Sequence, residues 1–351
     1  MTTEAIGYFF TQVGTPLEKR SFSIPPPQGD NVVVEIAGCG LCHTDLTFFE
    51  GVQTKKAAPL ILGHEISGRV IKAGPAAQHV VGKNVIIPAV LPCGECDLCR
   101  AGRENICQHQ KMPGNDFDGG FATHIVVPGR FVCVLPNDLG RHKVADLSVV
   151  ADAITTPYQS LKRSGVKAGE LAIVVGVGGV GIYMVQHAKN VGATVLALDV
   201  DEGRLAVAKA QGAAYTLNTK GLDQKELKSK IRALVKEHKL PAWQWRVFEM
   251  SGTKGGQETA YNLLSYAGTL AIVGFTMEKL DLRLSNLMAF DAECFGNWGC
   301  RPAYYDDVVK DVISNRVQLL DNVEYHPLST INEVFTASQK HQLTKRAILI
   351  P

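Results

Sequence analysis

The chain has 351 residues, enough for two domains and for sizeable hydrophobic cores. Apolar residues make up 46% of it and charged residues 20%, so intrinsic disorder is excluded on composition. Its 36 Lys and Arg nearly balance its 34 Asp and Glu, and a net charge of +2 gives no general attraction for nucleic acid or for an anionic membrane.

The sequence contains neither a recognisable signal peptide nor a segment that could span a membrane. The start, MTTEAIGYFF, lacks the basic stretch, apolar run and small-residue cleavage site of a signal peptide. The most apolar window, Leu171–Val185, contains four glycines and is too short to span a bilayer. We therefore expect a cytoplasmic protein with no nucleic-acid or membrane partner.

The first 150 residues are rich in short strands and turns. Runs of β-branched and apolar residues at 32–36, 68–71 and 84–87 are bounded by Gly, Pro and Asn. This pattern predicts an antiparallel, barrel-like β domain.

From about residue 155 apolar strands alternate with stretches of helical period. Strand, helix, strand in that order indicates parallel βαβ units. The predicted strands are 172–175, 194–198, 246–249 and 270–273, and the predicted helices are 179–191 and 201–211. Residues 220–240, rich in Lys and Glu, predict a solvated helical face, and the tail from 297 predicts a helix near 304–315 and a strand at 347–350.

A glycine-rich loop follows the first of these parallel strands. It reads Gly176-Val177-Gly178-Gly179-Val180-Gly181, opens a helix, and precedes a strand that ends at Asp199. In this context the motif predicts a dinucleotide site, with the pyrophosphate at the helix N-terminus and Asp199 on the adenosine ribose. An acidic group there repels a 2′-phosphate and favours NAD over NADP. The alternatives are a glycine turn that binds something else, and a helix-capping role for Asp199.

Four of the nine cysteines fall within fifteen residues, as Cys93, Cys96, Cys99 and Cys107. In a reducing compartment such a cluster favours a metal over disulfides. The seven-residue last spacer and the absence of Pro after Cys107 depart from the bacterial iron–sulfur pattern. The cluster therefore predicts a closed, structural zinc site with no open position.

A second constellation begins with Cys39-Gly40-Leu41-Cys42-His43, which matches a haem attachment pattern. We disfavour haem because there is no export signal, and a thioredoxin-like role because the motif is not in a βαβ unit. A catalytic zinc reading combines Cys42 with His64 and Asp152, which would leave one position for a substrate oxygen. Spacing alone does not show that these three residues meet.

Together these motifs resemble the zinc-dependent medium-chain alcohol dehydrogenase family along essentially the whole chain. The matching stretches are Gly40–Asp45, Gly63–Glu65, the cysteine cluster, Asp152–Thr156, the glycine loop, Val273–Phe275 and Arg346–Leu349. The resemblance implies an α/β protein with a GroES-like β-barrel catalytic domain at 1–153, a doubly wound Rossmann NAD-binding domain at 154–296, and a return segment at 297–351. It also implies two zinc ions per subunit, one catalytic and one structural, and a homo-oligomer, a dimer or a tetramer.

The resemblance assigns roles to particular residues around the metal. Cys42, His64 and Asp152 look like the catalytic zinc ligands, with Glu65 as a carboxylate that can approach the metal. Thr44 is similar to the hydroxyl residue that relays the substrate proton, and Asp45 to a residue that orients a zinc ligand. Some relatives carry a relay histidine where this chain has Thr47, which leaves the final proton acceptor open.

Coenzyme contacts follow from the same resemblance. They are Thr156, Gly274 and Phe275 at the nicotinamide, Arg204 near the adenosine ribose, and His43 and Arg346 at the pyrophosphate. The implied chemistry is zinc-assisted removal of a hydride from an alcohol to NAD.

A narrower resemblance, carried by 48–56, 112–116, 285–291 and 296–300, is to members of the family that oxidise a ring alcohol held as a coenzyme A (CoA) thioester. It implies a ketone product that is conjugated with a ring double bond, an enone. Slow conjugate addition of water to this enone at the same site is a further expectation. Lys55, Lys56 and Arg301 are candidates for the CoA phosphates, or ordinary surface charges. Phe48, Phe49 and Trp298 are candidate pocket walls, or core residues. The alternatives are another alcohol (benzyl alcohol, a secondary alcohol or a polyol) and a non-catalytic zinc- and nucleotide-binding relative.

Overall fold

The computed structural model describes residues 1–351, and the chain forms two compact units. Unit 1 contains Met1–Thr155 and Gly299–Pro351, and unit 2 contains Thr156–Trp298. Unit 1 is thus assembled from two separate segments of the chain, whereas unit 2 is continuous.

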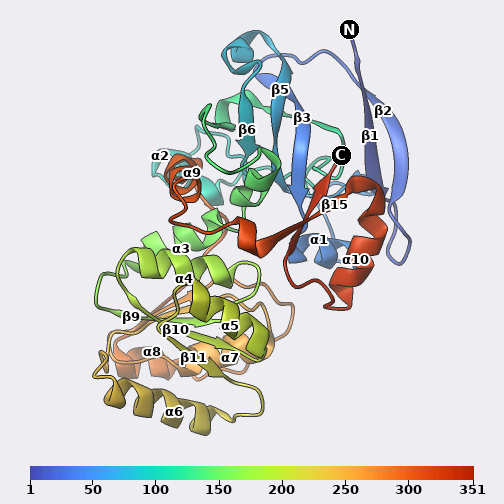
Figure 1. The fold of residues 1–351 in the computed structure, drawn as a ribbon. Helices are drawn as coiled ribbons and strands as arrows, with labels where there is room; N and C mark the ends of the chain where they lie inside the picture. Colours follow the sequence, from blue (N-terminus) through green and yellow to red (C-terminus); the bar gives the residue numbers. More distant parts are fainter. The chain divides into compact units, whose positions relative to one another are not determined.

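Unit 1 is organised around strand β3 (Asn31–Gly40), which pairs with three other strands (Figure 1). Its Val32, Val33 and Val34 are fully buried, as expected for β-branched residues on a pleated surface packed on both sides. The larger sheet has the order β15 (Val323–Pro327), β16 (Arg346–Ile350), β3, β5 (Glu65–Ala73), β6 (Asn84–Ile87) and β8 (Cys133–Val134), with β7 (His124–Pro128) also paired to β3. The smaller sheet has the order β2 (Glu18–Ile24), β1 (Thr3–Phe10) and β4 (Leu60–Ile61).

The last strand of the chain completes this sheet. β16 pairs antiparallel with β3 at the end of β3 that leads to Cys42, with Leu349 opposite Cys39 and Ile348 opposite Gly40. Ala347, Ile348 and Leu349 are essentially fully buried, so the apolar run of the tail is a core strand. This pairing brings Arg346, the first residue of β16, to the same end of the sheet.

Unit 1 also contains four short helices and seven 3-10 turns. The helices are α1 (His43–Phe49), α2 (Asp97–Arg100), α9 (Tyr305–Ile313) and α10 (Ile331–Gln339). The 3-10 turns are η1 (Pro75–Val80), η2 (Glu104–Ile106), η3 (Gly129–Phe131), η4 (Ala145–Ala151), η5 (Pro302–Tyr304), η6 (Leu320–Asn322) and η7 (Leu328–Thr330). The Phe49 and Phe335 rings, 5.1 Å apart, pack α1 and α10 together at the edge of the core.

Unit 2 is a six-stranded parallel sheet. Its order is β11 (Tyr215–Asn218), β10 (Thr194–Asp199), β9 (Leu171–Val175), β12 (Arg246–Glu249), β13 (Thr269–Ile272) and β14 (Glu293–Gly296). Its helices are α3 (Thr155–Ser164), α4 (Gly181–Asn190), α5 (Glu202–Gln211), α6 (Gln224–Glu237), α7 (Lys254–Asn262) and α8 (Ser285–Phe290). This order reverses between β9 and β12, which is the doubly wound arrangement and confirms the predicted α/β class.

The sequence pattern predicts no range for β11, β14, α3, α7 and α8 of unit 2, nor for β15 and α10 of unit 1. β11 and β14 are half-buried or exposed and lie at the two edges of the sheet, so they lack the continuous apolar run that marks the central strand β9. The helix expected to begin at 179 begins at Gly181, because the residues before it form the glycine loop.

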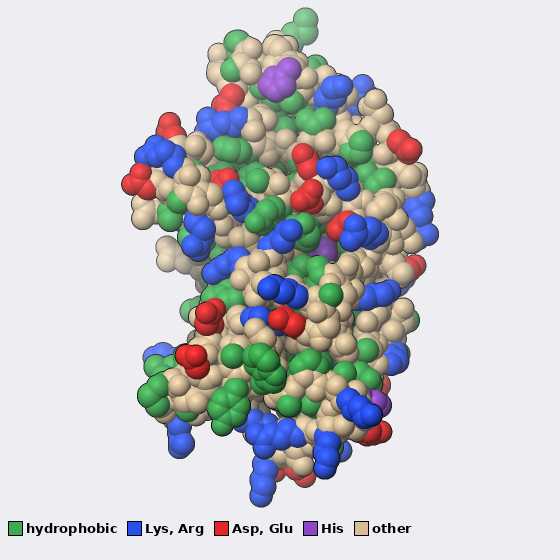
Figure 2. Space-filling model, turned by 90° about the vertical axis from the view of Figure 1, so that its left-hand side faces the viewer, with side chains coloured by type: hydrophobic (Ala, Val, Ile, Leu, Met, Phe, Trp, Pro, Cys, Tyr) green, Lys and Arg blue, Asp and Glu red, His purple; other side chains and the backbone are tan.

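The basic stretch predicted as a solvated face forms α6. Only Leu227, Ile231 and Val235 of this helix are buried, at the spacing of one helix face. Lys225, Lys228 and Arg232 line a shallow hollow on the surface of this helix. Figure 2 shows Lys and Arg side chains gathered on the part of unit 2 where Figure 1 places α6. No helix of the chain is both long and apolar enough to cross a membrane.

Gly68 of β5 marks a close approach of two strands in unit 1. A Cβ atom there would lie 2.2 Å from the backbone oxygen of Glu35 on β3. We expect Gly68→Ala to lower the free energy of unfolding by about 1–3 kcal/mol, measured by urea titration, because the strands must separate.

Gly255→Ala is the control, since nothing lies within 4 Å of the corresponding Cβ in helix α7. It should leave stability unchanged or raise it by up to about 1 kcal/mol. Equal stability of both variants would show that β5 has room for a methyl group.

Candidate active site and metal centres

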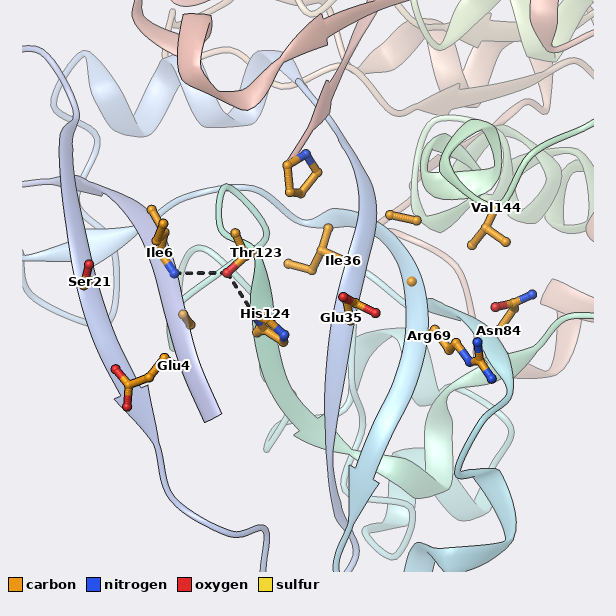
Figure 3. A pocket seen from close by; sticks show the side chains of 14 residues that line it. Glu4, Ile6, Ser21, Glu35, Ile36, Arg69, Asn84, Thr123, His124 and Val144 are labelled. Atoms are coloured by element: carbon orange, nitrogen blue, oxygen red, sulfur yellow. Dashed lines mark hydrogen bonds between the residues drawn. The ribbon is translucent and has the colours of Figure 1, made fainter. Parts of the chain in front are cut away.

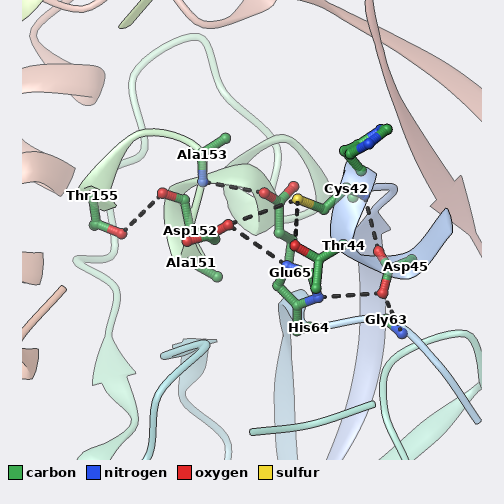
Figure 4. Close-up of polar contacts among 12 residues, drawn as sticks. Cys42, Thr44, Asp45, Gly63, His64, Glu65, Ala151, Asp152, Ala153 and Thr155 are labelled. Carbon is green, nitrogen blue, oxygen red and sulfur yellow. Dashed lines mark hydrogen bonds and ion pairs between the residues drawn. The ribbon is translucent and has the colours of Figure 1, made fainter. Parts of the chain in front are cut away.

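Three loops at one end of the large sheet bring Cys42, His64 and Asp152 together (Figure 4). Cys42 follows β3 and is the N-cap of α1, His64 directly precedes β5, and Asp152 follows η4. The Oδ2 atom of Asp152 lies 3.9 Å from Cys42 Sγ and 3.6 Å from His64 Nε2. These atoms and a Glu65 carboxylate oxygen all lie within 4.8 Å of one another.

The Asp45 side chain holds Cys42 and His64 in place through hydrogen bonds. Its Oδ2 accepts a hydrogen bond from the backbone N–H of Cys42 at 2.9 Å, and its Oδ1 lies 3.2 Å from His64 Nδ1 and accepts from Gly63 N–H at 3.1 Å. The side chain of Asp45 is fully buried. It therefore orients the imidazole so that Nε2 faces Cys42 and Asp152.

Glu65 forms a buried ion pair with Arg346 beside this cluster. Arg346 Nη1 lies 2.9 Å from Glu65 Oε1, which also accepts a hydrogen bond from Ala153 N–H at 3.1 Å. The other oxygen, Oε2, is buried without a hydrogen-bond partner. Burial raises the pKa of Glu65 to about 7, although Arg346 acts in the opposite direction.

The donor set of this cluster fits zinc. A thiolate, an imidazole and a carboxylate are the ligand types of catalytic zinc sites, and three of them leave a fourth position open. Burial disfavours a charged His64, yet the neighbouring Asp45 and Asp152 carboxylates raise the pKa of His64 well above its usual value. An excess of negative charge therefore surrounds the imidazole, which is the setting that a dication stabilises.

Thr44 and Thr47 both lie on α1 but in different surroundings. The Thr44 hydroxyl oxygen lies 3.8 Å from Cys42 Sγ, at the rim of the cluster. Thr47 instead donates its hydroxyl to the backbone oxygen of His43 at 3.0 Å. His43, the first residue of α1, is exposed.

Cys39 is separate from the metal cluster. It lies on β3 with only 1% of its surface exposed, and burial raises the pKa of its thiol well above the usual value. Cβ atoms at Gly63 and Gly120 would each come within 3 Å of its sulfur, so the thiol is enclosed by backbone. Cys39 and Cys42 therefore do not form the thiol pair that a haem attachment motif requires.

The four clustered cysteines converge as a second centre around α2. The Sγ–Sγ distances are 3.5 Å for Cys96–Cys99 and Cys93–Cys107, 3.6 Å for Cys96–Cys107 and 3.9 Å for Cys93–Cys99. Four sulfurs at a Zn–S distance of 2.3 Å would lie about 3.8 Å apart in a tetrahedron. The geometry therefore fits one zinc ion with all four positions filled.

Backbone N–H groups donate hydrogen bonds to sulfur atoms of this cluster. Cys93 N–H and His109 N–H both donate to Cys107 Sγ at 3.3 Å. A hydrogen bond from Cys99 N–H lowers the pKa of Cys96 to about 6, and burial raises that of Cys99 to about 12. The pKa of Cys93 is also lowered, chiefly by a backbone hydrogen bond from Glu95, whereas burial raises that of Cys107. Two thiols of the cluster are therefore more readily ionised than the two buried ones.

The glycine loop of unit 2 lies at the carboxyl end of β9. Gly176 has φ +85°, and a Cβ on Gly181 would lie 1.9 Å from the Gly176 oxygen, so α4 packs tightly on the loop. A Cβ at Gly178 would meet only the Arg204 guanidinium, 3.7 Å away. Gly179 and Val180 complete the turn into α4.

Asp199 at the end of β10 is engaged with backbone. Its Oδ2 accepts a hydrogen bond from Val177 N–H at 2.8 Å, and its Oδ1 accepts from Val200 and Asp201 N–H at 2.8 and 3.1 Å. Capping of α5 is performed by Asp201, which accepts from Arg204 N–H, so the alternative capping role does not belong to Asp199.

The remaining predicted coenzyme residues lie in both units. In unit 2, Thr156 is buried and its backbone oxygen accepts a hydrogen bond from Asn297, while Gly274 and the half-exposed Phe275 follow β13. In unit 1, the Arg346 guanidinium lies against Glu65 rather than in solvent, a contact that the sequence did not suggest.

The candidate cations for CoA phosphates already have carboxylate partners. Lys55 pairs with Asp116 at 3.1 Å, Lys56 with Asp118 at 2.6 Å, and Arg301 with Glu104 at 2.9 Å. Among the candidate aromatic walls, Phe48 belongs to the core, Phe49 packs against it, and Trp298 is half-exposed. The structure thus favours the ordinary structural role for all of these except Trp298.

A separate cavity of about 650 Å³ lies in unit 1, away from the metal cluster. It lies beside β1, β3, β5 and β7, where Glu35 is opposite both His124 and Arg69 in the strand register (Figure 3). None of the predicted site residues lines it.

Comparison with known proteins agrees with this geometry. Residues 28–137 match the alcohol dehydrogenase GroES-like domain, and residues 179–314 match the zinc-binding dehydrogenase domain. An alcohol dehydrogenase of Geobacillus stearothermophilus is 30% identical over 96% of this chain and 97% of its own length. A D-arabinose 1-dehydrogenase (NADP(+)) of Saccharolobus solfataricus is 29% identical over 96% of this chain and 95% of its own.

A solved structure is equally similar along its whole length. The alcohol dehydrogenase of the hyperthermophilic archaeon Aeropyrum pernix has a TM-score of 0.88 at 28% identity and covers 99% of this chain and 100% of its own. The chain belongs to the zinc-dependent medium-chain alcohol dehydrogenase family, with a GroES-like domain and a Rossmann-like parallel sheet. It is an oxidoreductase of CH–OH groups, which removes the non-catalytic alternative.

The orienting role of Asp45 can be tested on metal affinity. We expect Asp45→Asn to weaken metal binding at the Cys42 cluster by about 10- to 100-fold, because the ligands lose the carboxylate that fixes them. Competition with a chromophoric chelator measures this.

Asp146→Asn is the matched control. Asp146 is also a buried carboxylate of unit 1, but it accepts hydrogen bonds from Lys143 N–H and the Tyr325 hydroxyl, both at 2.8 Å, away from the ligands. Unchanged affinity in Asp45→Asn, or an equal loss in both variants, would contradict the orienting role.

Proposed function

We propose that this protein oxidises a secondary ring alcohol to a ketone, with NAD as the hydride acceptor and zinc at the Cys42, His64 and Asp152 site. The carbinol carbon gives up a hydride to NAD and the hydroxyl gives up a proton to the protein. One alcohol and one NAD therefore yield one ketone, one NADH and one proton.

The observation that carries the proposal is the convergence of Cys42 Sγ, His64 Nε2 and Asp152 Oδ2. Three protein ligands leave one tetrahedral position for a substrate oxygen. A zinc ion bound there would supply Lewis acidity that lowers the pKa of the substrate hydroxyl.

The proton leaves through Thr44 in this proposal. Its Oγ1, close to Cys42 Sγ, would accept the substrate proton while its own hydroxyl proton passes outward. Thr47 takes no part, because its hydroxyl is bonded to the His43 carbonyl. The half-buried Thr44 would therefore deliver the proton to water or to the coenzyme ribose rather than to a second side chain.

NAD is the proposed coenzyme because of the charge at the end of β10. The Asp199 carboxylate is held beside the glycine loop by hydrogen bonds from three backbone N–H groups. A ribose 2′-phosphate would be repelled there. Arg204, whose guanidinium lies over Gly178, would contact the adenosine side of the coenzyme.

Within this reaction class, we propose 6-hydroxycyclohex-1-ene-1-carbonyl-CoA as the substrate and 6-oxocyclohex-1-ene-1-carbonyl-CoA as the product, as in anaerobic breakdown of benzoyl-CoA. The support is the sequence resemblance in 48–56, 112–116, 285–291 and 296–300. Two of these stretches lie against each other, since Lys55 and Lys56 N–H groups donate to the side chain and backbone of Asn115 at 3.0 and 2.8 Å. Slow conjugate addition of water to the enone is part of the proposal, with the oxygen bonding the β-carbon and a proton the α-carbon.

The second candidate is oxidation of an alcohol without CoA. The relatives named above are alcohol and D-arabinose dehydrogenases. The carboxylate partners of Lys55, Lys56 and Arg301 also leave these cations less available to phosphate. Benzyl alcohol, other secondary alcohols and polyols are therefore the competing substrates.

Substrate identity is tested by NADH formation with the hydroxycyclohexene-carbonyl-CoA thioester, the same ring acid without CoA, and the competing alcohols. We expect reduction of NAD with the thioester, little reduction of NADP, and a slowly formed hydrated ketone detected by mass spectrometry. Activity only on free alcohols would remove the CoA proposal and leave the zinc- and NAD-dependent reaction. A preference for NADP would overturn the assignment from Asp199.

Zinc content separates the two metal centres. We expect about two zinc ions per wild-type chain and about one in Cys42→Ser, with loss of activity but a retained fold, because the four-cysteine site is intact. Cys107→Ser should also hold about one zinc ion and unfold at lower temperature.

Cys133→Ser is the control, since Cys133 is buried against Asp306 outside both centres and should keep both ions. Full zinc content in Cys42→Ser would contradict a metal at that site.

A further inference from the structure

Glu249 is a fully buried acidic residue that no role described above explains. It is the last residue of β12, which pairs with β9 on one side and β13 on the other. The strand order of unit 2 reverses between β9 and β12, and in doubly wound sheets ligands bind outside the carboxyl ends of the strands at this point. Glu249 therefore lies at the base of the expected ligand-binding edge.

The side chain of Glu249 holds the loop that follows its own strand. Its Oε1 accepts hydrogen bonds from Ser251 N–H at 2.8 Å, the Ser251 hydroxyl at 2.6 Å and Gly252 N–H at 3.1 Å. A carboxylate oxygen that accepts three hydrogen bonds fixes the loop more firmly than a neutral acceptor would, because hydrogen bonds to a charged group are stronger.

The backbone of Glu249 holds the loop after the neighbouring strand. Its carbonyl oxygen accepts from Val273 N–H at 3.0 Å and from Gly274 N–H at 3.2 Å. The two loops then meet directly, since a Cβ on Gly274 would lie 2.2 Å from the nitrogen of Gly252. A small shift of the first loop would therefore displace Gly274 as well.

The glycine loop rests on the same assembly. A Cβ at Gly176 would lie 2.7 Å from both Cα and Cβ of Ser251, the residue that Glu249 Oε1 holds. Met250 N–H also donates to Val175 O, which ties the two strand ends at 2.8 Å. Glu249 thus supports the pyrophosphate side and the nicotinamide side of the expected coenzyme site at once.

The carboxylate is retained at a cost to the fold. Its buried Oε2 makes no hydrogen bond of normal geometry, and burial raises the pKa of Glu249 despite the opposing effect of the Ser251 hydroxyl and of the Ser251, Gly252 and Gly274 N–H groups. An unsatisfied buried polar atom is destabilising, and native proteins tolerate few of them. An apolar residue would remove this cost but would leave the N–H groups of Ser251 and Gly252 without their acceptor.

We propose that Glu249 is a positioning residue for the coenzyme, which shapes the edge formed by the loops at 176–178, 251–252 and 273–274. The inference rests on the proposed function, in which this edge of unit 2 binds NAD. Glu249 acts through backbone and Ser251 rather than by touching the reacting atoms.

The test compares Glu249→Ala and Glu249→Gln with a carboxylate at the opposite end of the same sheet. Glu170 precedes β9 and pairs with Arg246, the first residue of β12, at 3.0 Å. Glu170→Ala should destabilise unit 2 but should not change the loops at the edge where the coenzyme is expected to bind. The measurements are the NADH Kd by fluorescence titration, kcat, the KM for NAD and for the alcohol, zinc content and the thermal midpoint.

We expect Glu249→Ala to raise the NADH Kd and the KM for NAD about tenfold or more, with the zinc content and the KM for the alcohol unchanged. Glu249→Gln keeps an acceptor at Oε1 and should stay within about threefold of wild type. Glu170→Ala should lower the thermal midpoint while leaving the NADH Kd unchanged. Should Glu249→Ala fail to fold, Ser251→Ala, which removes one of the three donors, should still raise the Kd about threefold.

An unchanged Kd in the folded Glu249 variants, or an equal rise in Glu170→Ala, would overturn the positioning role. Failure of the wild-type protein to bind NADH would instead count against the proposed function. If the wild type binds only NADPH, the same series with NADPH tests Glu249 independently of the coenzyme preference.

Discussion

The buried ion pair between Glu65 and Arg346 joins the metal cluster to the rest of unit 1. Arg346 Nη1 lies 2.9 Å from Glu65 Oε1, with exposed side-chain fractions of 7% and 0%. Removing one partner of such a pair leaves a buried charge and costs about 3–5 kcal/mol. The guanidinium also offsets part of the negative charge from Cys42, Asp45, Asp152 and Glu65, so the cluster can gather ligands for a dication without excessive repulsion. The position of Arg346 depends in turn on the pairing of β16 with β3.

The two clusters of candidate metal ligands differ in residue type and in surroundings. The Cys42 cluster lies in the interior of unit 1, next to β3, β5 and η4. The four-cysteine centre lies around a helix of only four residues, α2, which cannot be stable by itself. A closed zinc site can supply the missing stability of that loop, whereas an open site can be used for chemistry.

Local signals predicted part of this molecule well. The glycine loop, β9 and the cysteine cluster are each contained in a short stretch, so spacing was informative. Cys42, His64 and Asp152 are far apart in sequence, and only the family resemblance suggested that they meet. The contact of Arg346 with Glu65 arises from the pairing of distant strands, which no local pattern reports. Glu249 carries the same signal as Asp199, an acidic residue ending a buried parallel strand, but its partners are backbone groups of loops whose positions the sequence does not reveal.

The discontinuity of unit 1 has a consequence for biosynthesis. Unit 2 is one continuous segment, so it can be complete while the ribosome is still adding Gly299–Pro351. Unit 1 cannot finish its large sheet until β16 emerges, and until then Glu65 lacks the guanidinium that neutralises it. At that stage β3 can pair with β5 and β7, but its Cys39–Gly40 end lacks the partner strand that β16 later supplies. An unpaired strand end is a site for pairing with another chain.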